Sequence, residues 1–468
     1  MKQVISKLLL FFILLVGFET LNAQTKLPSI LSDNMLLQQS ADVKIWGWDA
    51  PGQSIVVNPS WTKSVKTTTN KEGKWQVLVS TPKAAKTGKL KITGSTKLTI
   101  NNVLFGEVWL CSGQSNMERQ LGFQNHQKPI VNFWEESQKA TYPSIRMFLV
   151  KKKKSNTPLE DCEGEWVECT PETVLKFSAV GYFYGKQLVD NLKIPVGLIQ
   201  SAWGGTKVEP WTPIEGVEKA ALENGGQKRF SNLYNGMISP IINYKIKGAI
   251  WYQGESNVSN WKEYKTLFPN MITSWRAQWN IGDFPFYFVQ IAPYNYPDKY
   301  GVAQIVEAQL EALELPNTGV AGTQDIGAIY DIHPPEKKEV GRRLSLVSLH
   351  KTYGKNDVIY SGPTLKSYKT EGQKLVLNFE TLGSKLHSVG AAMGKISAFY
   401  ISGENKTFHK ANVKQEGNKM ILSSPKVSKP VAVRYNWSNN ANGTLYNKEG
   451  LPALPFRTDN WDEVLYAE

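Results

Sequence analysis

One serine lies where a nucleophile would be expected, directly after an apolar, strand-like run. Residues 107–111 form that run, and they lead into Ser112-Gly113-Gln114-Ser115-Asn116-Met117-Glu118, which is typical of a turn that opens a helix. Ser115 would be exposed there, and the helix N-terminus would favour developing negative charge. A serine after such a turn is also a common helix cap. Met117 stands where the G-x-S-x-G motif of α/β-hydrolases requires glycine, so the sequence does not carry that motif.

Two more glycine-containing turns follow strand-like runs. Residues 196–199 precede Gln200-Ser201-Ala202-Trp203-Gly204-Gly205-Thr206, and residues 248–252 precede Gln253-Gly254-Glu255-Ser256-Asn257. Each turn alone could be purely structural. Together with the serine they would supply the hydrogen-bond donors of an oxyanion hole: the Ser115 amide, an amide of Gly204 or Gly205, and the side-chain amide of Gln253 or Asn257.

A serine nucleophile also needs a base, and the chain has five histidines. His333 differs from the others because it stands in Tyr330-Asp331-Ile332-His333-Pro334-Pro335, directly before a predicted helix. The two prolines fix the backbone of this loop. His333 is therefore the candidate base, and a histidine on a loop surface is the simpler alternative.

The elements that must position these residues are strands and helices that alternate between residues 102 and 355. Four apolar runs predict buried strands: 107–111, 196–199, 248–252 and 286–291. Helical periodicity predicts four helices: 179–191, 263–279, 302–314 and 336–353. This alternation predicts an α/β domain with a mainly parallel sheet flanked by helices, in which ligands bind at the carboxyl ends of the strands.

Short alternating runs with polar turns flank this region on both sides. They predict a β-sandwich-like domain over residues 24–101 and a second β domain over residues 356–468. Residues 1–23 are predicted to be a cleavable signal peptide, because two lysines precede an apolar run that ends at Leu21-Asn22-Ala23. No cysteine directly follows the cut to carry a lipid anchor. We therefore expect an exported protein, periplasmic or extracellular, without stable membrane insertion.

Composition argues against several other classes of protein. The 468 residues carry a formal net charge of +13, but an exported chain with scattered lysines is not expected to bind nucleic acid. The one dense run, residues 151–154, is expected to be a solvated loop. Three cysteines cannot build a disulfide scaffold, and their spacing fits no structural zinc site, so we expect neither a metal nor a cofactor. Cys162 and Cys169 could pair or stay free, whereas Cys111 is expected to be buried.

Four blocks, in this order, resemble the sialate O-acetylesterase family within the SGNH hydrolase superfamily. They are Gly113-Gln114-Ser115-Asn116-Met117, Trp203-Gly204-Gly205-Thr206, Gln253-Gly254-Glu255-Ser256 and Asp331-Ile332-His333-Pro334. Similar segments at residues 27–39 and 455–461 extend the resemblance over nearly the whole chain after residue 23. The resemblance implies an SGNH-type fold and a bacterial, exported serine esterase that removes O-acetyl groups from sialic acids without a metal.

The resemblance also implies roles for individual residues. Ser115 would be the nucleophile and His333 the base, with oxyanion donors from Ser115, the Gly204-Gly205 turn and Gln253. The acidic member is open: Asp331 lies two residues before the histidine, and not three as in many SGNH hydrolases. Glu255 is its rival, and a serine–histidine dyad oriented by a backbone carbonyl is the third option.

Substrate recognition rests on fewer signals. Four residues are candidates for contacts with the sugar: Arg119, Trp203, Trp211 and Asn257. Arg119 lies one helical turn after Ser115 and could meet a sialic acid carboxylate, and the tryptophans could stack on a sugar face. The same site would also serve an acetylxylan esterase or another polysaccharide O-acetylesterase. A catalytically inactive carbohydrate-binding protein is an alternative from a different class. The sequence does not predict the preferred acetyl position, the role of the β domains or the oligomeric state.

Overall fold

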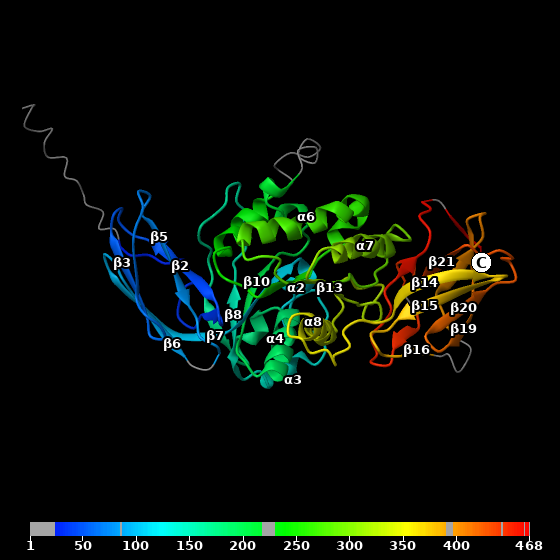
Figure 1. Ribbon diagram of the computed structural model, residues 1–468, viewed down its shortest axis with the longest axis horizontal. Helices are drawn as coiled ribbons and strands as arrows, with labels where there is room; N and C mark the ends of the chain where they lie inside the picture. The colour runs from blue at the N-terminus through cyan, green and yellow to red at the C-terminus, as the bar shows by residue number, and fades with distance from the viewer. Residues whose placement is uncertain are drawn as a thin grey trace, which may run out of the picture.

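The computed structural model describes residues 24–84, 87–217, 230–389, 396–440, 443–462 and 464–467. The signal peptide predicted over residues 1–23 lies outside the described residues. Three regions follow one another along the molecule: an N-terminal β region at one end, an α/β region in the centre and a C-terminal β region at the other end (Figure 1). The central region holds all the predicted site residues.

The central region is built on a mixed sheet whose strands follow the order β13-β12-β11-β7-β10-β8-β9. Neighbouring strands from β13 to β8 pair in parallel, and β9 pairs antiparallel with β8. Their bounds are β7 (Lys97–Gly113), β8 (Tyr142–Leu149), β9 (Trp166–Cys169), β10 (Val196–Ala202), β11 (Gly248–Tyr252), β12 (Phe286–Val289) and β13 (Thr318–Ala321). The four predicted strands are confirmed in β7, β10, β11 and β12. Every residue of β10, β11 and β12 is buried, because this part of the sheet is covered on both faces.

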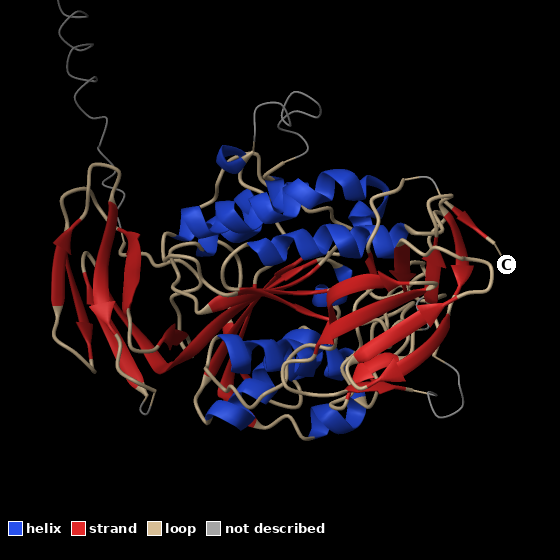
Figure 2. Ribbon diagram, turned by 45° about the vertical axis from the view of Figure 1, so that its right-hand side comes forward, coloured by secondary structure: helices blue, strands red, loops and turns tan. Residues whose placement is uncertain are grey.

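Helices lie above and below this sheet (Figure 2). On one face, α6 (Trp261–Trp279) and α7 (Gly301–Leu310) pack over Trp251 of β11. On the other face, α4 (Ala179–Leu192) and α8 (Lys337–Lys351) pack against each other and over Ile250 of the same strand. The predicted helices are confirmed to within a few residues, and a 3-10 turn over Glu311–Glu314 completes the one predicted to end at residue 314. Two short helices, α2 (Ser115–Glu118) and α3 (Phe133–Gln138), precede β8.

The chain changes its direction of travel across the sheet at β7. After β7 it forms β8 and β10 on one side, and then β11, β12 and β13 on the other. In open α/β folds, ligands bind at the carboxyl ends of the strands beside such a switch point. The loops that follow β7, β10 and β11 are the ones that carry most of the predicted site residues, so the topology gathers them at one edge.

The N-terminal β region is continuous with the central sheet. Its strands are β1 (Leu36–Gln38), β2 (Asp42–Trp48), β3 (Ser54–Pro59), β4 (Val65–Thr68), β5 (Lys74–Ser80) and β6 (Gly88–Thr93). Strand β6 pairs with the first part of β7, and the later part of β7 lies in the middle of the central sheet. Residues 101 and 102, expected to separate two domains, both lie inside this single 17-residue strand.

The C-terminal β region contains a four-stranded antiparallel sheet, a strand pair and a five-stranded sheet. The four-stranded sheet has the order β14 (Thr364–Glu371), β15 (Lys374–Glu380), β20 (Lys419–Ser423), β19 (Asn412–Glu416), and the pair is β16 (Leu386–Ser388) with β22 (Leu445–Asn447). The five-stranded sheet has the order β23 (Phe456–Arg457), β21 (Ala432–Tyr435), β17 (Phe399–Ser402), β18 (Thr407–Lys410), β24 (Leu465–Tyr466). Arg457 donates to both carboxylate oxygens of Glu307 on α7, at 2.8 and 2.9 Å, which ties this region to the centre.

All three cysteines are buried free thiols. Cys162 and Cys169 are therefore unpaired, and Cys111 is buried as predicted. Burial raises the pKa of both Cys162 and Cys169 to about 12, so neither thiol ionises readily near neutral pH. Among the described residues, no helix has the length and apolar character that crossing a membrane requires.

Candidate active site

Ser115 is the first residue of α2, and a sharp turn after β7 places it there. The turn depends on Gly113, which has φ 134° and lies so close to β11 that a Cβ would be 2.2 Å from the Tyr252 carbonyl oxygen. The next amide, that of Gln114, donates to the same carbonyl oxygen at 2.9 Å. The first amides of a helix have no acceptor within the helix, so the Ser115 N–H is available to a ligand.

The backbone of Gly204 packs directly against Ser115. A Cβ added to Gly204 would lie 3.2 Å from the Ser115 Cβ, and Gly205 adopts a left-handed φ of 72° that favours glycine. The Gly204 N–H donates to Glu118 Oε2 at 2.6 Å. The predicted oxyanion turn therefore lies beside the predicted nucleophile, and a carboxylate holds one of its amides in this structure.

Asn116 joins the Ser115 turn to the His333 loop. Its Nδ2 donates to the Ile332 carbonyl oxygen at 3.0 Å and to Glu255 Oε1 at 2.5 Å, and its Oδ1 accepts a hydrogen bond from Lys337 Nζ. Asn116 is fully buried, so these bonds form out of water. Because Ser115 and His333 are the chain neighbours of Asn116 and Ile332, this network joins the turn that carries the predicted nucleophile to the loop that carries the predicted base.

The environment of His333 favours the neutral imidazole. Its pKa lies below the ordinary value of 6.5, first because the ring is half-buried and second because Lys337 is nearby; Asp331 acts in the opposite direction. Burial disfavours the charged form of a histidine, and a neighbouring cation does the same. A neutral ring at physiological pH is the form that a general base needs.

Neither predicted acidic partner contacts the His333 ring among the hydrogen bonds of the described residues. Asp331 Oδ1 accepts from the backbone N–H of His333 at 2.9 Å, and its Oδ2 lies 3.6 Å from Lys128 Nζ. Glu255 binds Asn116 through Oε1, and its buried Oε2 has no hydrogen-bond partner among the described residues. Burial raises the pKa of Glu255. In this structure Asp331 therefore binds the backbone of its own loop, and Glu255 binds the side chain of Asn116.

The expected oxyanion role of the Gln253 and Asn257 side chains is wrong. Both are fully buried, and Gln253 Nε2 donates to the Thr206 carbonyl oxygen at 3.2 Å and to Asn257 Oδ1 at 2.7 Å. Those two bonds use both amide hydrogens of Gln253. Asn257 in turn accepts from the Val208 N–H at 3.0 Å and donates to Glu209 Oε2 at 2.9 Å. These two amides fix the turn that follows β10, and they do not face a substrate.

Two more of the predicted sugar contacts, in addition to Asn257, are wrong. Arg119 is 2% exposed, and its guanidinium donates to Gln124 Oε1 at 2.9 Å and to the Lys128 carbonyl oxygen at 2.5 Å. Trp211 is 0% exposed and lies in the core. Neither side chain offers a face to a ligand. Trp203 is partly exposed beside Gly204, so it keeps its place as a candidate.

Four polar residues that sequence reasoning gave no role belong to this site: Gln114, Asn116, Glu118 and Lys337. Gln114 Oε1 accepts from the Gly254 and Ser256 amides at 3.4 and 3.2 Å, which locks the β7 turn to the β11 turn. Lys337 is completely buried, and burial lowers its pKa to about 7. The first three lie in the segment from Ser112 to Glu118 that contains Ser115, and they could have been singled out there. Nothing in the local sequence marks Lys337 as a buried site residue, because it precedes a second lysine at the start of a helix, where exposed lysines are common.

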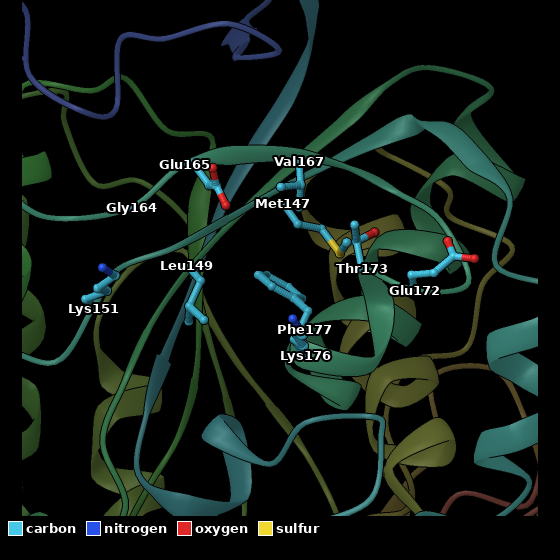
Figure 3. Close-up of a pocket in the computed structure, with 10 residues that line it drawn as sticks. All are labelled: Met147, Leu149, Lys151, Gly164, Glu165, Val167, Glu172, Thr173, Lys176 and Phe177. Atoms are coloured by element: carbon cyan, nitrogen blue, oxygen red, sulfur yellow. The ribbon is translucent and has the colours of Figure 1, made fainter.

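A surface pocket of about 530 Å³ lies elsewhere, beside β8 and β9 (Figure 3). Met147 and Leu149 of β8, Val167 of β9 and the Phe177 ring are among its lining residues. It contains none of the predicted site residues. Among the described residues, no group of three or more His, Cys, Asp or Glu side chains could hold a metal ion.

Comparison with known proteins agrees with the chemistry of these loops. A family model described as "Carbohydrate esterase, sialic acid-specific acetylesterase" matches residues 105–346, which is more than half of the chain. The sialate O-acetylesterases of Homo sapiens and Pongo abelii are each 30% identical to it over 404 residues, covering 75% of this chain and 76% of the relative. The crystal structure of a carbohydrate acetylesterase from Xanthomonas citri superposes with a TM-score of 0.86 at 35% identity, covering 94% of this chain and 100% of the other.

The matched range includes all four sequence blocks, from the Ser115 turn to the His333 loop. The fold, the gathered loops and these relatives agree with the predicted resemblance. The chain therefore belongs to the carbohydrate esterase family of sialic acid-specific acetylesterases, and it is a carboxylic ester hydrolase.

Proposed function

We propose that this esterase removes O-acetyl groups from sialic acids, with Ser115 as nucleophile and His333 as general base on an SGNH-type fold. The observation that carries the proposal is the hydrogen bond from Asn116 Nδ2 to the Ile332 carbonyl oxygen at 3.0 Å, because it holds the nucleophile turn against the base loop. Family membership supports the reaction class, and the names of the mammalian relatives support the sialate substrate.

The proposed reaction follows the acyl-transfer sequence of serine esterases. Neutral His333 accepts the proton from Ser115 Oγ as the oxygen attacks the acetyl carbonyl carbon, and the carbonyl oxygen becomes an oxyanion. His333 then donates that proton to the sugar oxygen, which leaves as an alcohol. Water attacks the acetyl-enzyme with His333 again as base, and acetate is released.

The oxyanion would accept hydrogen bonds from the Ser115 N–H and from the Gly204-Gly205 turn. Because Glu118 accepts the Gly204 N–H in this structure, a substrate oxygen must either displace that carboxylate or use the exposed Gly205 amide. The remaining donors are main-chain groups on neighbouring loops of the same sheet edge. Such fixed donors need no reorganisation as charge develops, which is why they contribute strongly to catalysis.

Asp331 acts in this proposal as a positioning residue for the base. Its carboxylate accepts the backbone N–H of His333 at 2.9 Å, and this bond fixes the loop between Tyr330 and the two prolines. Glu255 acts one step further away, because it holds Asn116, which in turn holds the carbonyl oxygen of Ile332. The two carboxylates therefore have separate tasks.

The test is acetate release from p-nitrophenyl acetate and from O-acetylated sialic acid by protein that lacks residues 1–23. Ser115→Ala and His333→Ala are each expected to lower turnover by ~1000-fold or more. Ser54→Ala, which alters an exposed serine on β3, is the matched control and keeps full activity. Undiminished turnover by Ser115→Ala would refute the nucleophile. Turnover of acetylated xylan without any on sialate would favour the polysaccharide alternative, and sugar binding without turnover would favour an inactive binding protein.

We also propose that the protein is exported to the periplasm or the outside of the cell after removal of residues 1–23. The two lysines and the apolar run of that segment support this location. N-terminal sequencing of the protein recovered from a bacterial periplasmic fraction tests it, with a new N-terminus near Gln24 as the expected result.

A further inference from the structure

The lysine run of residues 151–154 lies at the same sheet edge as Ser115. It follows the carboxyl end of β8, and β8 pairs in parallel with β10, whose own carboxyl end leads to Gly204. The Val150 amide, just before the run, donates to the Gln200 carbonyl oxygen at 2.9 Å. The run is an exposed loop, as expected, and the strand pairing places it beside the predicted oxyanion turn.

The backbone of this run is anchored at both ends. The Lys151 N–H donates to the Glu163 carbonyl oxygen at 2.9 Å, and the Ser155 N–H donates to the Asn232 carbonyl oxygen at 3.0 Å. Between them, the Lys153 carbonyl oxygen lies against Gly236, where a Cβ would come within 2.0 Å of it. The backbone that carries the four lysines is therefore more restricted than that of a free loop.

The four lysines differ in how their charge is compensated. Lys151 pairs with Glu163 at 3.0 Å, and Lys152 pairs with Glu118 at 2.5 Å. Lys153 is close enough to Glu163 for an electrostatic attraction between the two charges. Lys154 has no carboxylate within ion-pair distance among the described residues. Lys153 likewise forms no ion pair with the described residues, so two of the four positive charges of the run, those of Lys153 and Lys154, are not matched by a carboxylate at that distance.

Two of these ammonium groups lie over the ring of Trp203. Lys152 Nζ lies 5.4 Å and Lys154 Nζ 5.2 Å from the centroid of its ring. An aromatic face attracts a cation at this range but carries no net charge, so it holds the two lysines without neutralising them. Two like charges over one ring repel each other, and Glu118 offsets only one of them. An anion that binds here would relieve that repulsion.

We propose that Lys154, held over Trp203 beside Lys152, binds the carboxylate of an acidic sugar whose O-acetyl group Ser115 attacks. This inference rests on the proposed function, and it specifies how the site distinguishes a sugar acid from a neutral acetylated sugar. It also replaces Arg119, the cation that the sequence suggested for this task, because Arg119 is 2% exposed and already bonded to its own loop.

The experiment compares O-acetylated N-acetylneuraminic acid with its C1 methyl ester, which has the same acetyl group and no carboxylate. The measured quantity is the ratio of kcat/KM for the acid to kcat/KM for the ester, so any general damage to a variant cancels. Wild type is expected to prefer the acid by about tenfold, the effect of one hydrogen bond to a charged group. Added salt is expected to reduce that preference, because an exposed ion pair is screened.

Lys154→Gln is expected to bring the ratio close to one, and Lys154→Glu to bring it below one. The matched control is Lys153→Gln, which removes the same charge from the neighbouring position and is expected to keep the wild-type ratio. A Lys154→Gln ratio equal to that of wild type would overturn the inference, as would an equal fall for Lys153→Gln.

The failure of the inference and the failure of the proposed function give different results. If wild type hydrolyses the acid and the methyl ester equally well, the sialate activity stands and the lysine assignment is wrong. If wild type hydrolyses p-nitrophenyl acetate and neither sialate substrate, the proposed function fails and the lysine assignment fails with it.

Discussion

Replacing Gln253 with alanine tests whether its amide serves the oxyanion or the protein. The side chain is fully buried, and its amide donates to the Thr206 carbonyl oxygen and to Asn257 Oδ1. Its own oxygen accepts from the Tyr264 hydroxyl at 2.9 Å. Gln253→Ala removes all three bonds and leaves the turn after β10 without its support.

The loss of unfolding free energy in Gln253→Ala depends on which hydrogen bonds the former partners of Gln253 retain. Asn257 Oδ1 keeps the Val208 N–H, whereas the Thr206 carbonyl oxygen and the Tyr264 hydroxyl lose the closest partners they have. The Tyr264 hydroxyl keeps a longer hydrogen bond to the Gln253 carbonyl oxygen at 3.5 Å. A buried polar group left unsatisfied costs about 1–3 kcal/mol, so the loss at the Thr206 carbonyl oxygen lowers the free energy of unfolding by about that amount, and the weaker bond of Tyr264 adds to it. Displacement of the Gly204 backbone by about 1 Å would also lower turnover by ~100-fold.

The assay pairs urea unfolding, followed by tryptophan fluorescence, with kcat on p-nitrophenyl acetate. Tyr264→Phe is the control, because it removes one of the same hydrogen bonds from the α6 side. It is expected to cost about 1 kcal/mol of unfolding free energy with little change in kcat. Gln253→Ala is expected to lose stability and turnover together.

The opposite pattern would refute this reasoning. If Gln253→Ala unfolds at the wild-type urea concentration and loses only kcat, its amide acts on the oxyanion and the bond to Thr206 does not hold the turn. Loss of a direct oxyanion donor commonly costs ~100- to 1000-fold in kcat, so kcat alone does not separate the two cases. The unfolding measurement does.

Two further predictions concern the charge beside the base and the two tryptophans. The rate needs neutral His333, so kcat/KM falls as pH drops through its pKa, which burial and then Lys337 hold below 6.5. Lys337→Gln removes the second cause and is expected to move this acidic limb to higher pH in a pH–rate profile; a limb that stays in place or moves lower would contradict the assignment. Trp211→Ala is expected to lower the free energy of unfolding by about 3–5 kcal/mol, because the ring is fully buried. Trp203→Ala is expected to raise KM for acetylated sialic acid and to lower the free energy of unfolding less than Trp211→Ala does, because the Trp203 ring is only partly buried against the core. Equal effects of the two changes on both measurements would contradict the separation of core and site.

The sequence predicted the positions of the central strands and of the loops between them well, because both depend on local patterns of residue types. Continuous apolar runs marked β10 and β11, and glycine marked the turns that need it, as at Gly113 with its φ of 134°. Helical periodicity located α4 and α6 to within a few residues. The boundary expected at residue 101 falls inside β7, because this long strand pairs with β6 in its first part and with the central strands in its last part, and its sequence does not mark where the partners change.

Side-chain direction within the loops could not be predicted. Gln253, Asn257 and Arg119 come from the expected loops and have the chemistry of ligand-binding groups, yet each is turned toward the protein. A buried loop amide must be paired, and whether its partner is a ligand or a neighbouring loop depends on strands far apart in the chain. The burial of Lys337 under Tyr252 is decided in the same way.

The sequence by itself thus determined the family, the order of the blocks and the identity of Ser115 and His333 as the candidates for chemistry. Only the tertiary structure decided that Asn116 links their loops, that Glu118 holds the Gly204 amide, and that a lysine from the loop after β8 comes to lie over Trp203. The physical reason is that parallel strands bring their carboxyl ends to one edge whatever their separation in sequence, so contacts at that edge are set by strand order, which no local pattern encodes.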